Sequence, residues 1–127
     1  MSRESLFLLL AAVGLTPIAL AYGLAPSTTV PMLYGVEVDS VGATHIFRAV
    51  MGLYLAMVIF WILGARSESL RFAALCSVFV FMAGLAAGRF LSIVVDGIPA
   101  VMLVVYLFLE IGFALVAYRL ARAFPGR

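Results

Sequence analysis

The sequence predicts an all-α membrane protein: an up-down antiparallel bundle of four transmembrane helices with both termini in the cytoplasm. Two observations predict this class. Hydrophobic residues make up 66% of the 127 residues and charged residues only 11%, a balance that ordinary soluble domains do not have. The apolar residues also fall into segments of roughly 20 residues, the length of helix that crosses the hydrocarbon layer of a bilayer.

The predicted spans cover about residues 5–25, 45–65, 71–95 and 100–118. The first span also fits a secretory signal peptide, because Arg3 precedes a leucine-rich run and Ala19-Leu20-Ala21 resembles a cleavage site. Since the sequence begins at Met1, we expect this span to be retained.

The connections between the spans differ in length. Residues 26–44 contain prolines, glycines and two acids, so we predict an outer loop without a helix, with a short extended piece at residues 34–38. The other two connections are short, which forces neighbouring spans to run antiparallel. Residues 1–127 are therefore taken as a single transmembrane domain.

Arginines set the expected orientation, because they favour the cytoplasmic side of a membrane. The predicted layout places six of them on one side: Arg3, Arg66, Arg71, Arg119, Arg122 and Arg127. The opposite loops contain Glu37, Asp39 and Asp96 and no arginine. We therefore expect a multi-pass protein of a bacterial inner membrane, with the acidic loop facing the periplasm.

The composition excludes several classes of function. A formal net charge of +2, without a single lysine, is too small to indicate nucleic-acid binding. One cysteine, Cys76, and one histidine, His45, exclude an internal disulfide and a multi-residue Cys/His metal site within one chain. We expect no metal, no cofactor and no catalytic residues.

Three charged residues lie inside the apolar spans: Arg48, Arg89 and Glu110. Charges within a membrane are costly, so they face the bundle interior or a hydrated cavity and pair with one another. A long arginine side chain can reach a carboxylate ~6–7 Å away in depth, which favours an Arg89–Glu110 pair. Arg48 is then expected to point inward with incomplete compensation of its charge.

Other polar residues share a helix face with one of these charges and complete the candidate ligand site: His45, Ser92, Asp96 and Tyr106. We predict one polar cavity in the outer half of the membrane, with Glu110 at its floor. Two interpretations remain open. The charges form a closed network that fixes helix register, or a surplus guanidinium binds a lipid headgroup, a quinone or a small acid.

Gly84 and Gly88 form a small-xxx-small pattern in the third span, immediately before Arg89. Small residues at this spacing let two helices approach closely. This face is the predicted contact for a membrane partner or a second copy of the chain.

Two motifs carry a family resemblance. FRAxxGLY lies at residues 47–54 and GRxxSxxxDGxP at residues 88–99, and the surrounding sequence resembles a bacterial family of small four-helix membrane proteins filed as a domain of unknown function. The resemblance covers nearly the whole chain; it implies four spans and no established activity. A fainter similarity, to DoxX-like four-helix membrane proteins, rests on the fold alone.

The first functional hypothesis is a small noncatalytic membrane protein, either an accessory subunit or a binder of a lipophilic or anionic ligand. The second is a membrane-embedded enzyme that uses Glu110 as acid or base and Arg48 and Arg89 to hold an anion, which a single carboxylate makes weaker. The third is a small transporter that acts as an oligomer, for which the cytoplasmic half lacks a polar path.

Overall fold

The computed structural model describes residues 1–125, and this range is helical without any strand. It contains five helices, α1 (Arg3–Gly23), α2 (Pro26–Tyr34), α3 (Val41–Arg66), α4 (Glu68–Asp96) and α5 (Val101–Ala123). All except α2 are long and apolar enough to cross a membrane, which confirms the four predicted spans. Arg127, one of the arginines used to predict the orientation, lies outside the described residues.

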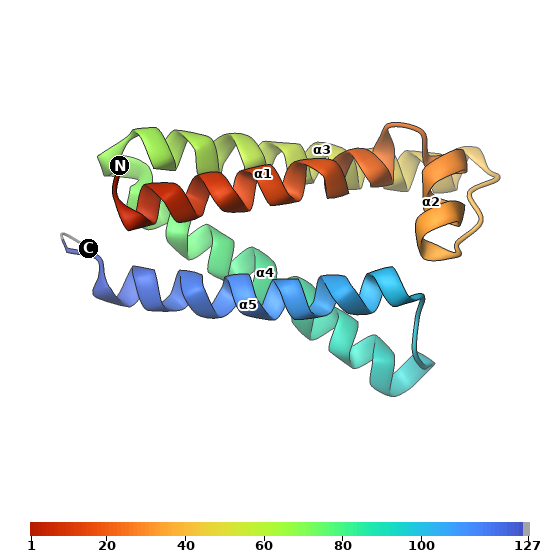
Figure 1. Ribbon diagram of the computed structural model, residues 1–127. Coiled ribbons are helices and arrows are strands. Elements are labelled where there is room, and N and C mark those ends of the chain that lie inside the picture. Colours follow the sequence, from red (N-terminus) through yellow and green to blue (C-terminus); the bar gives the residue numbers. More distant parts are fainter. Residues whose placement is uncertain (126–127) are drawn as a thin grey trace.

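The long helices associate in pairs. α1 lies along α3, α4 packs against α5 and crosses it obliquely, and Ser67 alone connects α3 to α4. Figure 1 shows that α1 begins and α5 ends at the same end of the molecule. It also shows that the C-terminal half of α4 diverges from α1 and α3, and nearly all residues from 87 to 99 are correspondingly exposed.

The helix α2 corrects the predicted loop at residues 26–44. Pro26 occupies the first helical position, where its missing N–H has no partner to lose. Thr29 Oγ1 donates to the Ala21 carbonyl at 2.6 Å and so ties α2 to α1. Val30 and Tyr34 are buried on one face, and Gly35 ends the helix in a left-handed conformation with a φ of 70°. Packing against α1 therefore outweighs the prolines and glycines that predicted a loop.

Small residues bring α1, α3 and α4 together near the start of α1. A side chain at Gly64 of α3 would collide with the Cβ of Ala74 of α4 and touch Leu8 of α1. Trp61 is fully buried beside this point and donates its Nε1–H to Ser77 Oγ at 3.0 Å. Close approach of this kind is how membrane helices gain packing energy.

Gly84 and Gly88 behave differently. Both are exposed, and a Cβ at either position would have no neighbour within 4 Å. The small-xxx-small pattern of α4 therefore mediates no close helix contact within the described chain.

Candidate functional site

Arg89 of α4 and Glu110 of α5 form the ion pair that the sequence predicted. The Nε–H of Arg89 donates to both carboxylate oxygens of Glu110, at 2.9 and 3.1 Å. Glu110 is only 6% exposed. Among residues 1–125, Glu110 and Ser5 are the only buried residues classed as polar or charged. The pair thus neutralises a carboxylate that would be costly to leave alone in the bundle.

Tyrosines surround this pair. Four of the chain's five tyrosines are buried here, each from a different helix: Tyr22 of α1, Tyr34 of α2, Tyr54 of α3 and Tyr106 of α5. The ring centroids of Tyr22 and Tyr34 lie 4.9 Å apart, and Tyr54 meets the Tyr22 ring edge-on at 5.8 Å. The aromatic cluster therefore joins α1, α2, α3 and α5 around a charge pair carried by α4 and α5.

Polar contacts link the tyrosines to the pair. Arg89 Nη2 donates to the Tyr22 hydroxyl at 3.4 Å, and its guanidinium carbon lies 5.6 Å from the centroid of the Tyr106 ring. The hydroxyls of Tyr106 and Tyr34 are hydrogen-bonded at 2.8 Å. The last contact fastens α2 to α5, although the two helices are far apart in sequence.

One edge of the Arg89 guanidinium is left with spare donors. Arginine has five N–H groups arranged as a planar fork. Glu110 takes Nε, Tyr22 takes Nη2 through one long bond, and within residues 1–125 Nη1 has no hydrogen-bond acceptor. Every buried side-chain nitrogen and oxygen in this range has a partner, so Nη1 is not enclosed. The Arg89 side chain as a whole is 19% exposed.

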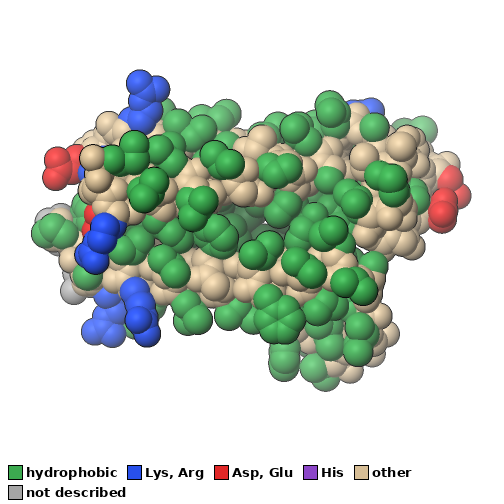
Figure 2. Space-filling model, viewed as in Figure 1, with side chains coloured by type: hydrophobic (Ala, Val, Ile, Leu, Met, Phe, Trp, Pro, Cys, Tyr) green, Lys and Arg blue, Asp and Glu red, His purple; other side chains and the backbone are tan. Residues whose placement is uncertain are grey.

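Arg89 lines two recesses. One lies between α1 and α5, reaches Tyr54 and Glu110, and has a volume of about 70 Å³; Figure 2 shows a hollow on this face between the two helices. The other lies between α4 and α5, beneath Gly84 and Gly88, and has a volume of about 340 Å³. The first is well below the size range of ligand pockets, which the second reaches.

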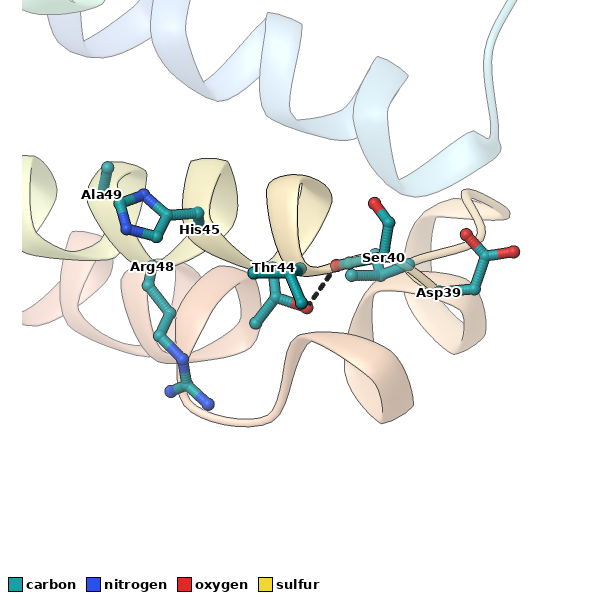
Figure 3. A pocket seen from close by; sticks show the side chains of 8 residues that line it. Asp39, Ser40, Thr44, His45, Arg48 and Ala49 are labelled. Carbon is teal, nitrogen blue, oxygen red and sulfur yellow. Dashed lines mark hydrogen bonds between the residues drawn. The ribbon is translucent and has the colours of Figure 1, made fainter.

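Arg48 does not point into the bundle as expected. Its side chain is exposed, and its Nη1 donates to the Gly23 carbonyl at 3.0 Å, at the C-terminus of α1. Figure 3 shows the side chain directed toward the segment that joins α1 to α2. The last carbonyls of a helix lack intrahelical partners, so the guanidinium finds an acceptor while staying near the surface.

His45 and Arg48 belong to a different recess from Arg89. They line a hollow of about 700 Å³ at the start of α3, together with Asp39 and Thr44. Most of its lining residues are exposed, so it is an open surface rather than an enclosed cavity. The structure therefore does not bring His45 and Arg48 to the Arg89–Glu110 pair.

Ser92 and Asp96 continue the face of α4 beyond Arg89, as the spacing predicted. Both are exposed, and Ser92 Oγ donates to Asp96 Oδ2 at 2.7 Å. Ser92 lines the larger recess with Arg89, and Asp96 does not. The site thus combines the predicted Arg89, Glu110, Ser92 and Tyr106 with Tyr22, Tyr34 and Tyr54, which sequence reasoning missed.

Replacing Tyr34 with phenylalanine is expected to loosen α2. The change removes the partner of a buried hydroxyl on Tyr106, which costs about 1–2 kcal/mol. Hydrogen exchange measured by mass spectrometry should show faster exchange in α2 and unchanged exchange in α3. Equal acceleration in both helices would contradict a local role for this hydrogen bond.

The same contact predicts a dependence on pH. Burial, followed by the hydrogen bond to Tyr106, raises the pKa of Tyr34 above its ordinary value of 10.0. A raised pKa means that the stability it contributes is complete below pH 10 and is lost as the pH rises further, because the detached tyrosine then ionises more readily. Exchange in α2 should therefore accelerate above pH 10 beyond its intrinsic rate, and less so in Tyr34→Phe.

Comparison with known proteins supports one assignment. No curated protein and no solved structure matches the chain significantly. The family described as Domain of unknown function (DUF4345) matches residues 4–121, a range that includes most of every helix and all the site residues named above. The chain therefore belongs to the DUF4345 family.

Proposed function

We propose that the chain is one multi-pass domain of a bacterial inner membrane, with four antiparallel spans and both termini in the cytoplasm. The arginines support this orientation, since positive residues favour the cytoplasmic side. Figure 2 shows blue side chains gathered at the end where α1 begins and α5 ends. Arginines in or beside the helix ends found there are Arg3, Arg66, Arg71, Arg119 and Arg122.

The proposed function is noncatalytic binding of a lipophilic molecule whose polar head accepts hydrogen bonds from Arg89. The spare Nη1 edge of Arg89 is the observation that carries this proposal. Arginine binds carboxylate, phosphate and carbonyl oxygens through such an edge. Because Glu110 is held by Nε, the ligand does not need to displace the internal ion pair.

The recess between α4 and α5 favours an amphiphile over a small polar molecule. Leu85, Ile93 and Leu103 provide apolar walls, while Arg89 provides hydrogen-bond donors. Its volume of about 340 Å³ admits a head group or a ring with the start of an apolar tail. A lipid or a quinone-like molecule has this combination of acceptor head and apolar body.

The two other hypotheses receive less support from the geometry. The Nε–H of Arg89 donates to both oxygens of Glu110, so an acid or base role would require Glu110 to leave this contact. A transport path needs polar groups in both halves of the membrane. Near the start of α1 the described core is mostly apolar, with Leu8, Trp61 and Leu75 fully buried and Ser5 as its buried polar residue.

Native mass spectrometry of the protein purified in mild detergent, followed by lipid extraction, tests the proposal. We expect one stoichiometric lipophilic adduct on the wild type. Arg89→Met/Glu110→Leu removes the guanidinium without stranding a charge and should lose the adduct. Gly88→Leu fills the recess at a position with free space and should lose it as well, with Arg89 and Glu110 still present.

Arg48→Gln is the matched control, because it removes an arginine that lines neither recess of Arg89. It should keep the adduct. A wild-type protein without any adduct, or an adduct that persists in Gly88→Leu, would exclude binding in this recess.

The open face at Gly84 and Gly88 favours a second candidate, an accessory subunit that packs another membrane helix there. Both glycines are exposed and have room for close approach. This candidate predicts a co-purifying protein, or a second copy of the chain, in the same spectra. Gly88→Leu would then release that partner, and no small adduct would be found in the wild type.

A further inference from the structure

Two neighbouring recesses lie on α4 and α5 toward the end of α5, and they share no lining residue with the recess of Arg89. One has a volume of about 300 Å³ and the other about 510 Å³. Phe79, Tyr118 and Arg122 line both recesses, so these side chains form a ridge between them. Leu115 and Arg119 complete the larger one.

The ridge presents a positioned positive charge. Arg122 Nη1 donates to the Tyr118 hydroxyl at 3.3 Å, and its guanidinium carbon lies 5.7 Å from the centroid of the Tyr118 ring. Arg119 and Arg122 are both exposed. The ion pair of Arg89 is the only one found in residues 1–125, so neither of these two arginines has an acidic partner in that range.

The rest of the lining of the two recesses is apolar and aromatic. The rings of Phe79 and Tyr118 meet edge-on with their centroids 5.6 Å apart. Phe72 and Val80 line the smaller recess, and Leu115 lines the larger one. Two arginines beside two apolar recesses complement an anionic lipid, whose negative headgroup joins two apolar chains.

We propose that this double recess binds one anionic phospholipid from the leaflet at this end of the bundle. The phosphate lies between Arg119 and Arg122, whose forks match its oxygens. One acyl chain lies on each side of the Phe79–Tyr118 ridge. The site is separate from the recess of Arg89, so the proposal goes beyond the function proposed above and fails or holds independently of it.

Native mass spectrometry with added phospholipids of identical chains tests this proposal. The wild type should bind one phosphatidylglycerol in preference to phosphatidylethanolamine. Arg119→Gln/Arg122→Gln should weaken phosphatidylglycerol binding roughly 30-fold, as expected from the loss of two interfacial arginines. Arg3→Gln/Arg66→Gln removes the same charge from the same end but outside the recesses, and it should bind as the wild type does.

A second variant and a second measurement locate the site. Leu115→Trp keeps every arginine, and therefore the topology signal, but fills the larger recess from an exposed position; it should lose the preference. Cys76, the chain's one cysteine, lines the smaller recess, so added phosphatidylglycerol should slow its alkylation.

Each contrary result overturns the proposal. Equal weakening in both double arginine variants would indicate diffuse attraction, and a wild-type preference in Leu115→Trp would exclude the recess. If Arg119→Gln/Arg122→Gln does not fold, Leu115→Trp and the alkylation rate decide the question on their own.

Discussion

Glu110→Gln is expected to destabilise the protein by about 3 kcal/mol, the largest effect of a single polar substitution in this chain. Removing one member of a buried ion pair costs about 3–5 kcal/mol because the other charge stays behind without a partner. The lower end of that range applies, because the Arg89 side chain is 19% exposed. Unfolding by sodium dodecyl sulfate in mixed micelles, followed by circular dichroism, gives the free-energy difference.

The double variant Arg89→Met/Glu110→Leu should return to within about 1 kcal/mol of the wild type, since apolar residues of similar volume leave no charge behind. The full cycle of single and double variants isolates the coupling between the two residues. Additive effects would mean that the ion pair does not stabilise the bundle. An added acidic amphiphile should also stabilise the Glu110→Gln variant more than it stabilises the wild type. The unpaired guanidinium of Arg89 then gains an anion.

Gly64→Leu is expected to destabilise the protein by about 3 kcal/mol. Overpacking destabilises the core of a membrane protein for the same physical reason as that of a soluble protein. It costs about 1–3 kcal/mol or more. A Cβ at Gly64 would collide with the Cβ of Ala74, which is fixed to its own backbone. α3 and α4 must therefore move apart. The same denaturation assay measures the loss.

Gly88→Leu is the matched control. Gly88 also lies within a long apolar helix, but a Cβ added there would have nothing within 4 Å. Apart from any gain in helix propensity, this substitution should change the free energy of unfolding by no more than about 0.5 kcal/mol, as surface substitutions do. A large loss at Gly88 and none at Gly64 would contradict the close approach of α3 and α4 at Gly64.

The four long helices were predictable because the length and apolarity of a span are properties of its own residues. The Arg89–Glu110 pair was predictable for a related reason. Glu110 is the one acid deep inside an apolar span, and a charge in lipid must find a partner. These inferences needed no knowledge of how the helices are rotated.

Features that depend on rotation or on distant contacts were not predictable. Arg48 lies close enough to the end of its span to reach the Gly23 carbonyl, so the reason for pairing inside the bundle does not apply to it. The helix α2 depends on a hydrogen bond from Thr29 to Ala21 and on the burial of Tyr34. Neither contact leaves a periodic pattern in nine residues.

The tyrosine cluster was missed for the same reason. Its members come from four helices, and only Tyr106 shares a helix with one of the paired charges. A sequence signal did exist, because Tyr22, Tyr34 and Tyr106 lie away from the arginine-rich end and Tyr54 lies at the middle of α3. That bias becomes a site only when all the helices are packed together.

The ion pair also bears on how the chain is made. Arg89 and Glu110 are 21 positions apart, on helices that follow one another directly. A lone charge within a span opposes its insertion, by about 2.5–3.5 kcal/mol where it lies at the centre. If α4 and α5 leave the insertion machinery as a hairpin, both charges enter the lipid as one neutral unit. The Arg89–Glu110 pair can thus form before α4 and α5 pack against α1, α2 or α3.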